Sequence, residues 1–136
     1  MGMSPETLIP LAVDGVTERF DPIECLDERT RTRAGEGMPD GPGRYILIEG
    51  SGRSLVLPLG EQPIHIGRGL AADLHLDESS VSRRHAILVP RPKGPRVLDD
   101  RSSNGTFVNG LRVQQADLES GDVIVLGRVV LRYLEV

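Results

Sequence analysis

Residues 66–110 read IGRGLAADLHLDESSVSRRHAILVPRPKGPRVLDDRSSNGTFVNG, and this stretch decides the fold. Three polar clusters interrupt it: Gly-Arg at 67–68, Ser-Arg-Arg-His at 82–85 and Ser-Ser-Asn-Gly at 102–105. Short apolar runs of strand length separate the clusters. We therefore expect a sheet to hold the clusters together as one surface that binds an anion, because hydroxyl, backbone N–H and guanidinium groups together can cradle a phosphate.

Apolar runs of the same kind continue on both sides of this stretch. The Asn109-Gly110 pair between two of them is a strong signal for a two-residue hairpin turn, since both positions tolerate positive φ. The pattern predicts about ten short strands, which is typical of an all-β sandwich. The expected strands cover residues 45–48, 55–59, 64–66, 74–76, 86–89, 97–98, 106–108, 111–113, 123–126 and 129–134.

The composition agrees with one small domain. The chain has 136 residues, enough for a single core, and its aromatic content of 3% makes that core aliphatic. The lone Cys25 excludes an internal disulfide, which suits a reducing compartment. The first residues have no secretory pattern, and no apolar run approaches a membrane span. We expect a cytoplasmic protein that does not bind membranes.

The charge is distributed unevenly along the chain. The net charge of −4 argues against general binding of nucleic acid. Residues 1–43 carry nine acids and four arginines (net −5), whereas residues 60–112 carry eight bases and six acids (net +2). Residues 34–43, AGEGMPDGPG, have a linker composition. We therefore expect a largely flexible, acidic tail and linker over 1–43 with a regulatory role, and a folded domain over 44–136.

Two kinds of catalytic or metal site are disfavoured. Ser82 and His85 lie in one loop, without the strand–turn–helix context of a hydrolase nucleophile and without a third group. The ten-residue spacing of His65, His75 and His85 puts two of them on outward-facing strand positions that point in different directions, so a shared metal site is not expected. The sequence predicts no enzyme, no metal and no cofactor.

Four separated motifs, in this order and at this spacing, resemble the forkhead-associated (FHA) domain family. The resemblance covers about residues 44–136 and leaves the first 43 outside it. It is carried by Gly67-Arg68, by Asp73, Leu74, Leu76 and Asp77, by Val81-Ser82-Arg83 with His85, and by Ser103-Asn104-Gly105-Thr106 with Val108-Asn109-Gly110.

The resemblance implies a sandwich of about eleven strands that binds phosphothreonine through loops at one end. Arg68 would hold the phosphate through charge-assisted hydrogen bonds, and Ser82 would donate its hydroxyl to a phosphate oxygen. Arg83 would add backbone or side-chain contacts. Ser103 would contact the phosphate or the wall near the threonine methyl, and Asn104 would bond to the main chain of the bound peptide.

Other motif residues would support the site. These are Gly67, His85, Gly105, Asn109 and Gly110, with His85 bracing the loops. Ser80 and Arg101 would touch residues downstream of the phosphothreonine.

The function that follows is a non-catalytic, phosphothreonine-binding adaptor or regulatory module in Ser/Thr kinase signalling. The expected partners are a phosphothreonine protein or peptide, a Ser/Thr kinase and the chain's own phosphorylated tail. Thr30 and Thr32, which lie in the mixed-charge run 27–33, are the candidate phosphoacceptors. The alternative is a regulator that docks on and controls an enzyme through the same loops without phosphate, and is switched by phosphorylation of Thr30 or Thr32.

Overall fold

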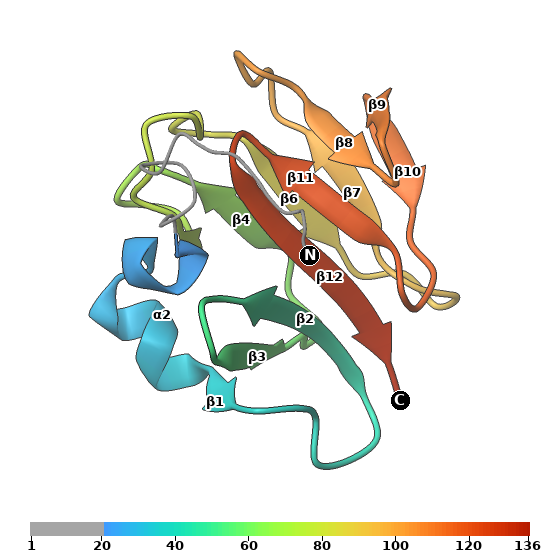
Figure 1. Cartoon of the computed structure of the whole chain (residues 1–136). Helices are drawn as coiled ribbons and strands as arrows, with labels where there is room; N and C mark the ends of the chain where they lie inside the picture. Colours follow the sequence, from blue (N-terminus) through green and yellow to red (C-terminus); the bar gives the residue numbers. More distant parts are fainter. Residues whose placement is uncertain (1–20) are drawn as a thin grey trace, which may run out of the picture.

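Two antiparallel-rich sheets pack face to face in the computed structural model, which describes residues 21–136 (Figure 1). The larger sheet has the strand order β1-β3-β2-β12-β11-β8-β9, and the smaller one has β10-β7-β6-β4-β5. The strands of the described part are β1 (Gly35–Glu36), β2 (Arg44–Glu49), β3 (Ser54–Pro58), β4 (Ile64–Gly67), β5 (Leu74–His75), β6 (Ala86–Val89), β7 (Arg96–Asp99), β8 (Thr106–Val108), β9 (Leu111–Val113), β10 (Gln115–Asp117), β11 (Val123–Leu126) and β12 (Val129–Glu135).

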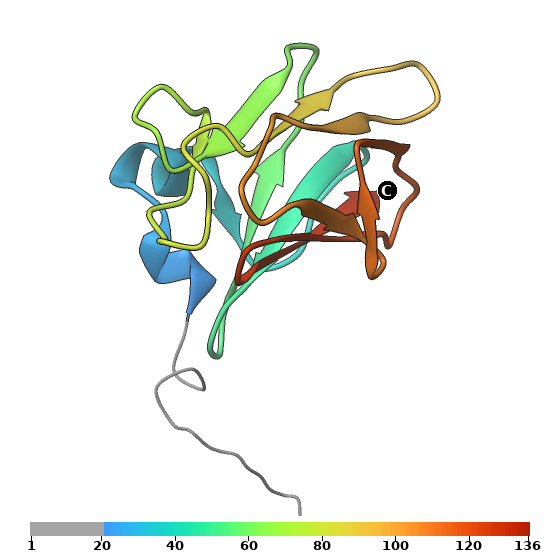
Figure 2. The same cartoon turned by 90° about the horizontal axis from the view of Figure 1, so that it is seen from above.

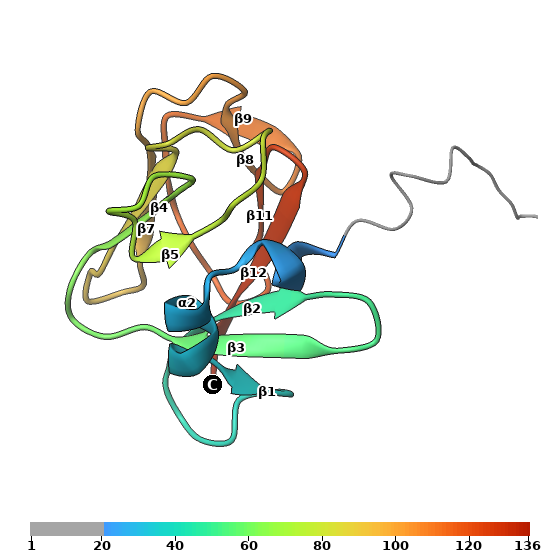
Figure 3. The ribbon, with the colours of Figure 1, turned by 90° about the vertical axis from the view of Figure 1, so that its left-hand side faces the viewer.

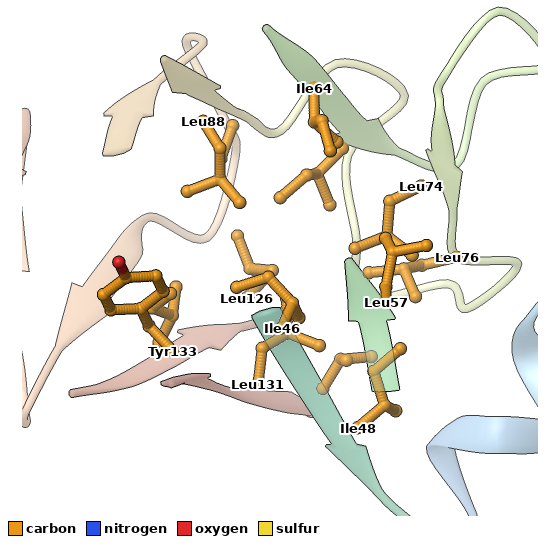
Figure 4. Close-up of a cluster of buried hydrophobic side chains, with 14 of the residues drawn as sticks. Ile46, Ile48, Leu57, Ile64, Leu74, Leu76, Leu88, Leu126, Leu131 and Tyr133 are labelled. Atoms are coloured by element: carbon orange, nitrogen blue, oxygen red, sulfur yellow. The ribbon is translucent and has the colours of Figure 1, made fainter. Parts of the chain in front are cut away.

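Alternating side chains build the core between the sheets. Along β12, Val129, Leu131 and Tyr133 are fully buried, whereas Val130 is 44% exposed. This period of two is what a strand with one buried face requires. Figure 4 shows leucines and isoleucines of both sheets meeting in the middle, with Tyr133 as the aromatic member. The expected aliphatic core and all-β sandwich are therefore confirmed.

The strand count also agrees with the expectation. Within residues 44–136, β2 to β12 make eleven strands. The pattern missed β10, whose sequence Gln-Ala-Asp is polar, and it missed β1, which pairs with β3 through Gly35 opposite Val56.

Ordered elements already occur before residue 44, where the sequence predicts the folded domain to start. A short 3-10 helix, η1 (Pro22–Cys25), and a helix, α2 (Glu28–Arg33), lead into β1. Ile23 and Leu26 join the core cluster, at 1% and 4% exposed. The carboxylates of Asp21 and Asp27 cap the two helices by accepting from the backbone N–H groups of the first turn. Apolar burial and capping thus order a segment whose composition indicates flexibility. The first 20 residues of the expected tail lie outside the described part.

The strand register places the three polar clusters at one end of the sandwich. Ile66 on β4 pairs with Ala86 on β6, and Ala86 pairs with Asp99 on β7. Residues that follow Ile66, precede Ala86 and follow Asp99 therefore leave the sheet side by side. In Figure 2, the yellow β5–β6 connection lies next to the orange β7–β8 connection. Among residues 21–136, no helix is long and apolar enough to cross a membrane.

Candidate functional site

The Gly67-Arg68 end of β4 is held tightly by the β5–β6 connection. The N–H of Arg68 donates to the carbonyl of Ser82 at 2.9 Å, and the N–H of Gly69 donates to that of Arg83 at 3.1 Å. A Cβ at Gly67 would collide with the carbonyl oxygen of Arg83, so only glycine permits this approach.

The side chain of Arg68 is anchored on the same connection. Its Nε donates to the carbonyl of Val81 at 3.0 Å. This bond uses neither terminal nitrogen of the guanidinium, and within the described residues both stay available for an anion. A planar fork held at its base in this way suits a phosphate oxygen pair.

Three loops carry the polar clusters: the first covers 68–73, the second 76–85 and the third 100–105. His85 joins the second loop to the third. It is fully buried, and its Nδ1 accepts from the N–H of Ser82 at 3.0 Å. Its Nε2 lies 2.9 Å from the carbonyl of Gly105, an acceptor, so Nε2 carries the proton. Both ring nitrogens are occupied by these bonds, and neither is left to act as a base on the Ser82 hydroxyl.

The Ser82 hydroxyl joins the second loop to the third. The N–H of Ser103 donates to Ser82 Oγ at 2.9 Å. Because that oxygen already accepts a hydrogen bond, its own proton is free to point at a ligand oxygen. Ser82 and Ser103 therefore stand next to one another at the mouth of the site, as the motif implies.

Asp99, the last residue of β7, fixes the start of the third loop through hydrogen bonds from Ser102. Its carboxylate accepts from the N–H and hydroxyl of Ser102, at 3.0 and 2.6 Å, and from the Thr106 hydroxyl at 2.7 Å. Burial opposes the charged form, but these hydrogen bonds outweigh it and hold the pKa of Asp99 below its usual range. The Ser102 hydroxyl in turn accepts from the N–H of Gly105 at 2.9 Å.

Asn104 lies against the second loop from the other side. Its Nδ2 donates to the carbonyl of Ser80 at 2.8 Å, so its Oδ1 can accept from a peptide N–H. Ser80 also receives the N–H of Arg128 on its hydroxyl oxygen and donates to Glu78. The hydrogen bond from Arg128 overcomes the burial of Glu78 and lowers its pKa to about 2.

An open hollow of about 310 Å³ lies over these loops. Its walls are Ser82, Arg83, Arg84, Asp100, Arg101 and Ser103. The sequence motifs do not predict Arg84 and Asp100 as site residues. For Arg101 they predict only a contact with peptide residues downstream of the phosphothreonine. Arg84 pairs with Asp100 at 3.0 Å, and Arg101 has a φ of 60°, which is rare for a residue other than glycine. Loop arginines look solvated in a sequence, and only the converging backbone shows that they share one hollow.

Asn109 and Gly110, by contrast, lie away from this hollow. They form the β8–β9 turn with φ values of 51° and 86°, at the end of β8 opposite Thr106. The side chain of Asn109 bonds to Asp122 and to the N–H of Val123. These two residues therefore shape the β8–β9 turn, and their support of the binding site stays a prediction.

The two candidate phosphoacceptors differ in accessibility. Thr30 is the fully buried residue of α2, with its Oγ1 3.5 Å from the N–H of His75. Thr32, one half-turn further, is exposed and donates its hydroxyl to the carbonyl of Glu28.

The three histidines do not gather. His65 is exposed, but His75 is only 7% exposed, which corrects the expectation that it faces outward. Within the described residues no group of three or more His, Cys, Asp or Glu side chains could hold a metal ion.

Known proteins are similar to this chain in sequence and in architecture. The model of the FHA domain family matches residues 64–127. The chain is 30% identical to an oxoglutarate dehydrogenase inhibitor of Corynebacterium jeikeium, over 97% of this chain and 96% of that protein. It is 46% identical over 79 residues to an ABC transporter ATP-binding/permease protein of Mycobacterium tuberculosis, of which it spans only 9%.

A solved structure from a study of phosphothreonine-dependent FHA domain interactions superposes with a TM-score of 0.61. It is 36% identical, and the match covers 68% of this chain and 96% of that one. With a relative matched along nearly its whole length and loops that meet as the motifs require, the chain belongs to the FHA domain family of phosphothreonine-binding modules.

Proposed function

We propose that this protein is a non-catalytic regulatory module that recognises a phosphothreonine protein through Arg68, Ser82, Arg83, Ser103 and Asn104. The observation that carries the assignment is the bond from the Ser103 N–H to Ser82 Oγ, because it sets two loops at the distance where both can face one phosphate. The proposed compartment is the cytoplasm, where a Ser/Thr kinase would create the ligand.

Each residue has a distinct part in this proposal. Arg68 supplies the paired donors, and Ser82 adds its free hydroxyl proton. Arg83 borders the hollow, Ser103 lines the wall near the threonine methyl, and Asn104 accepts from the peptide backbone. A phosphothreonine carries about −1.5 to −2 charges at neutral pH, so charge-assisted bonds dominate its affinity.

His85 cannot serve as a general base for Ser82. Its ring lies between Ser82 N–H and the Gly105 carbonyl, and neither nitrogen can accept a proton from the serine hydroxyl. Without an activating base, Ser82 acts as a donor to phosphate and not as a nucleophile.

A second function, control of an enzyme by direct docking, is favoured by the relative that is named an oxoglutarate dehydrogenase inhibitor. In this version the same loops contact the enzyme without phosphate, and phosphorylation of the chain's own N-terminal segment blocks them. Thr32 suits that switch better than Thr30, because the Thr30 hydroxyl is buried in the folded protein.

An array of matched peptides separates the two functions. Each sequence is presented with threonine, phosphothreonine and phosphoserine, and binding is then quantified by calorimetry for the best sequences. We expect binding only to the phosphorylated peptides, with phosphoserine binding weaker than phosphothreonine binding by the roughly 1–3 kcal/mol that one methyl group contributes in a fitted pocket. Equal binding of phosphorylated and unphosphorylated peptides would overturn the phosphate-dependent function and favour docking.

A further inference from the structure

The backbone that presents Arg68 rests on the short edge strand β5. Gly67 is paired with His75 in the parallel β4–β5 register, and the N–H of Leu76 donates to the Gly67 carbonyl at 2.9 Å. The ring of His75 then reaches over the end of β4, where its Nε2 lies 3.0 Å from the carbonyl oxygen of Arg68. One side of the Arg68 backbone is thus held by His75 and its neighbours.

The segment Asp21–Arg33 covers the free edge of β5. Leu26 forms an isolated bridge with Leu76, and the N–H of Asp77 donates to the Cys25 carbonyl at 2.7 Å. The backbone N–H of His75 donates to Thr30 Oγ1 at 3.5 Å. Figure 3 shows α2 beside β5 and next to β3, so the segment joins the edge of one sheet to the other.

Two arginines of α2 strengthen the same contact. Arg29 donates to the carbonyl of Ala72 at 2.8 Å, and Arg33 donates to that of Asp73 at 3.0 Å. Both acceptors lie in the β4–β5 connection, which starts at Arg68. The segment therefore holds this connection at its far end as well as at β5.

His75 is an unusual choice for a buried strand position. Since the Arg68 carbonyl can only accept, Nε2 donates its proton to that oxygen. Nδ1 is buried and has no hydrogen-bond partner in the described part of the chain; Asp27 Oδ2 stands 3.6 Å away. An apolar side chain would avoid this unsatisfied nitrogen, so the bond to Arg68 is the gain that offsets it.

We propose that Asp21–Arg33 is a positioning element for the phosphate-binding arginine, acting through the hydrogen bond from His75 to the Arg68 carbonyl. The proposal rests on the proposed function, in which Arg68 holds the phosphate. The segment fixes β5, β5 fixes the His75 ring, and the ring fixes the backbone from which the Arg68 side chain extends. Release of the segment loosens Arg68 and weakens phosphothreonine binding, although no residue of the segment contacts the ligand.

Variants of His75 test the last contact in this series, the hydrogen bond from His75 to the Arg68 carbonyl. His75→Phe keeps a buried ring but removes the donor, and His75→Gln places an amide N–H near the position of Nε2. Calorimetry with the tightest phosphothreonine peptide from a degenerate library should show about threefold to tenfold weaker binding for His75→Phe, the effect of one lost hydrogen bond. His75→Gln should restore affinity to within about twofold. The matched control His65→Phe, on the exposed face of β4, should bind as wild type.

Variants of the two threonines test the first contact in this series, the packing of α2 against β5 through Thr30. Thr30→Gln puts a long polar side chain into a fully buried position of α2, whereas Thr32→Gln puts it on the exposed side of the same helix. Thr30→Gln should weaken binding as His75→Phe does, and Thr32→Gln should not. The double variant Thr30→Gln/His75→Phe should bind no more weakly than either single variant, because both changes interrupt one pathway.

A phosphorus NMR titration shows whether Arg68 itself has moved. The guanidinium should hold the pKa of the bound phosphate below its usual value of about 6. In folded His75→Phe that pKa should rise toward the free value, which a purely structural change elsewhere would not cause. Circular dichroism melts establish that each variant is folded at the assay temperature.

The outcomes separate this inference from the proposed function. If wild-type protein binds no phosphothreonine peptide, the proposed function fails. If wild type binds and folded His75→Phe binds equally well, or His75→Gln loses as much as His75→Phe, only the positioning role is overturned.

Discussion

At the scale of single residues, the site is made by backbone geometry before any side chain meets a ligand. Gly67 lets β4 approach the carbonyl of Arg83 closely, and His85 fixes the second and third loops to one another. The polar side chains then project from a frame with little freedom left. Such preorganisation reduces the entropy that a peptide loses on binding.

Replacement of Arg68 by alanine should remove most phosphopeptide binding and leave the sandwich folded. A hydrogen bond to a charged group contributes about 1.5–3 kcal/mol, which corresponds to roughly 10-fold to 150-fold in affinity. Calorimetry measures the loss, and a thermal melt checks the fold. Arg96→Ala is the matched control, because Arg96 pairs with Asp117 on β10 and does not line the hollow. Unchanged affinity of Arg68→Ala would refute the site assignment.

Glu78 should make the free energy of unfolding depend on pH in the acidic range. Its pKa falls from 4.5 to about 2 in the folded protein, because the hydrogen bond from Arg128 outweighs burial. A pKa that is lower when folded gives stability that is complete above about pH 4.5 and is lost as pH falls toward about 2.

Urea unfolding of Glu78→Gln at several pH values measures this contribution. Arg128 is 44% exposed, so solvent screening should limit the loss at pH 7 to about 1 kcal/mol. The difference from wild type should shrink between pH 4.5 and pH 2. Glu61→Gln, at an exposed position, serves as the control; a Glu78→Gln deficit that stays constant with pH would contradict the assignment.

Much of this site could be predicted from sequence, because its residues form short contiguous motifs. Arg68, Ser82, Ser103 and Asn104 lie in the loops where the motifs place them. Arg84 was not predicted as a wall of the hollow, since a charge in a loop carries no periodic signal. The burial of His75 could not be predicted, because strand alternation cannot reveal a helix that packs over an edge strand.

At the scale of elements, two different kinds of sequence pattern predict the strands and the N-terminal helices. β11 is a continuous apolar run and β12 has an apolar residue at every buried position, so the sequence predicts both well. The run Asp-Glu-Arg-Thr-Arg-Thr-Arg at 27–33 has no apolar face, yet it forms α2. Its signal is the cap residue Asp27, followed by an acid in the first turn and arginines in the last, which complement the helix dipole.

Leu26 offers a direct test that residues before 44 belong to the fold. It is 4% exposed and bridges Leu76, so Leu26→Ala should destabilise the protein by about 2–5 kcal/mol. A flexible tail would predict no change. Urea unfolding monitored by circular dichroism measures the free energy, and Met38→Ala, at a side chain that is 63% exposed, should have little effect. Equal stability of the two variants would return the boundary to residue 44.

At the scale of the whole molecule, the loops that carry the polar clusters meet at one end of the sandwich, and residues 21–33 pack beside them on β5. The ligand's charge then decides the affinity. Phosphothreonine loses its second charge below about pH 6, so binding should weaken by about tenfold between pH 7.5 and pH 5. Fluorescence anisotropy of a labelled phosphopeptide measures this, with a thermal melt at each pH to verify folding. Equal affinity at both pH values would contradict the prediction that the protein recognises the phosphate dianion.

Phosphorylation of the chain's own segment depends on the same arrangement. A kinase must take an extended stretch around the threonine into its active site, so the helix has to open locally first. Thr32 lies in the last turn of α2 and is exposed, whereas exposing Thr30 also breaks the contacts of α2 with His75. Incubation with a Ser/Thr kinase, followed by site-resolved mass spectrometry over time, should therefore show Thr32 modified before Thr30. Faster modification of Thr30 than of Thr32 in the wild-type protein would mean that the segment does not stay packed on β5, and would remove the basis for a switch at Thr32.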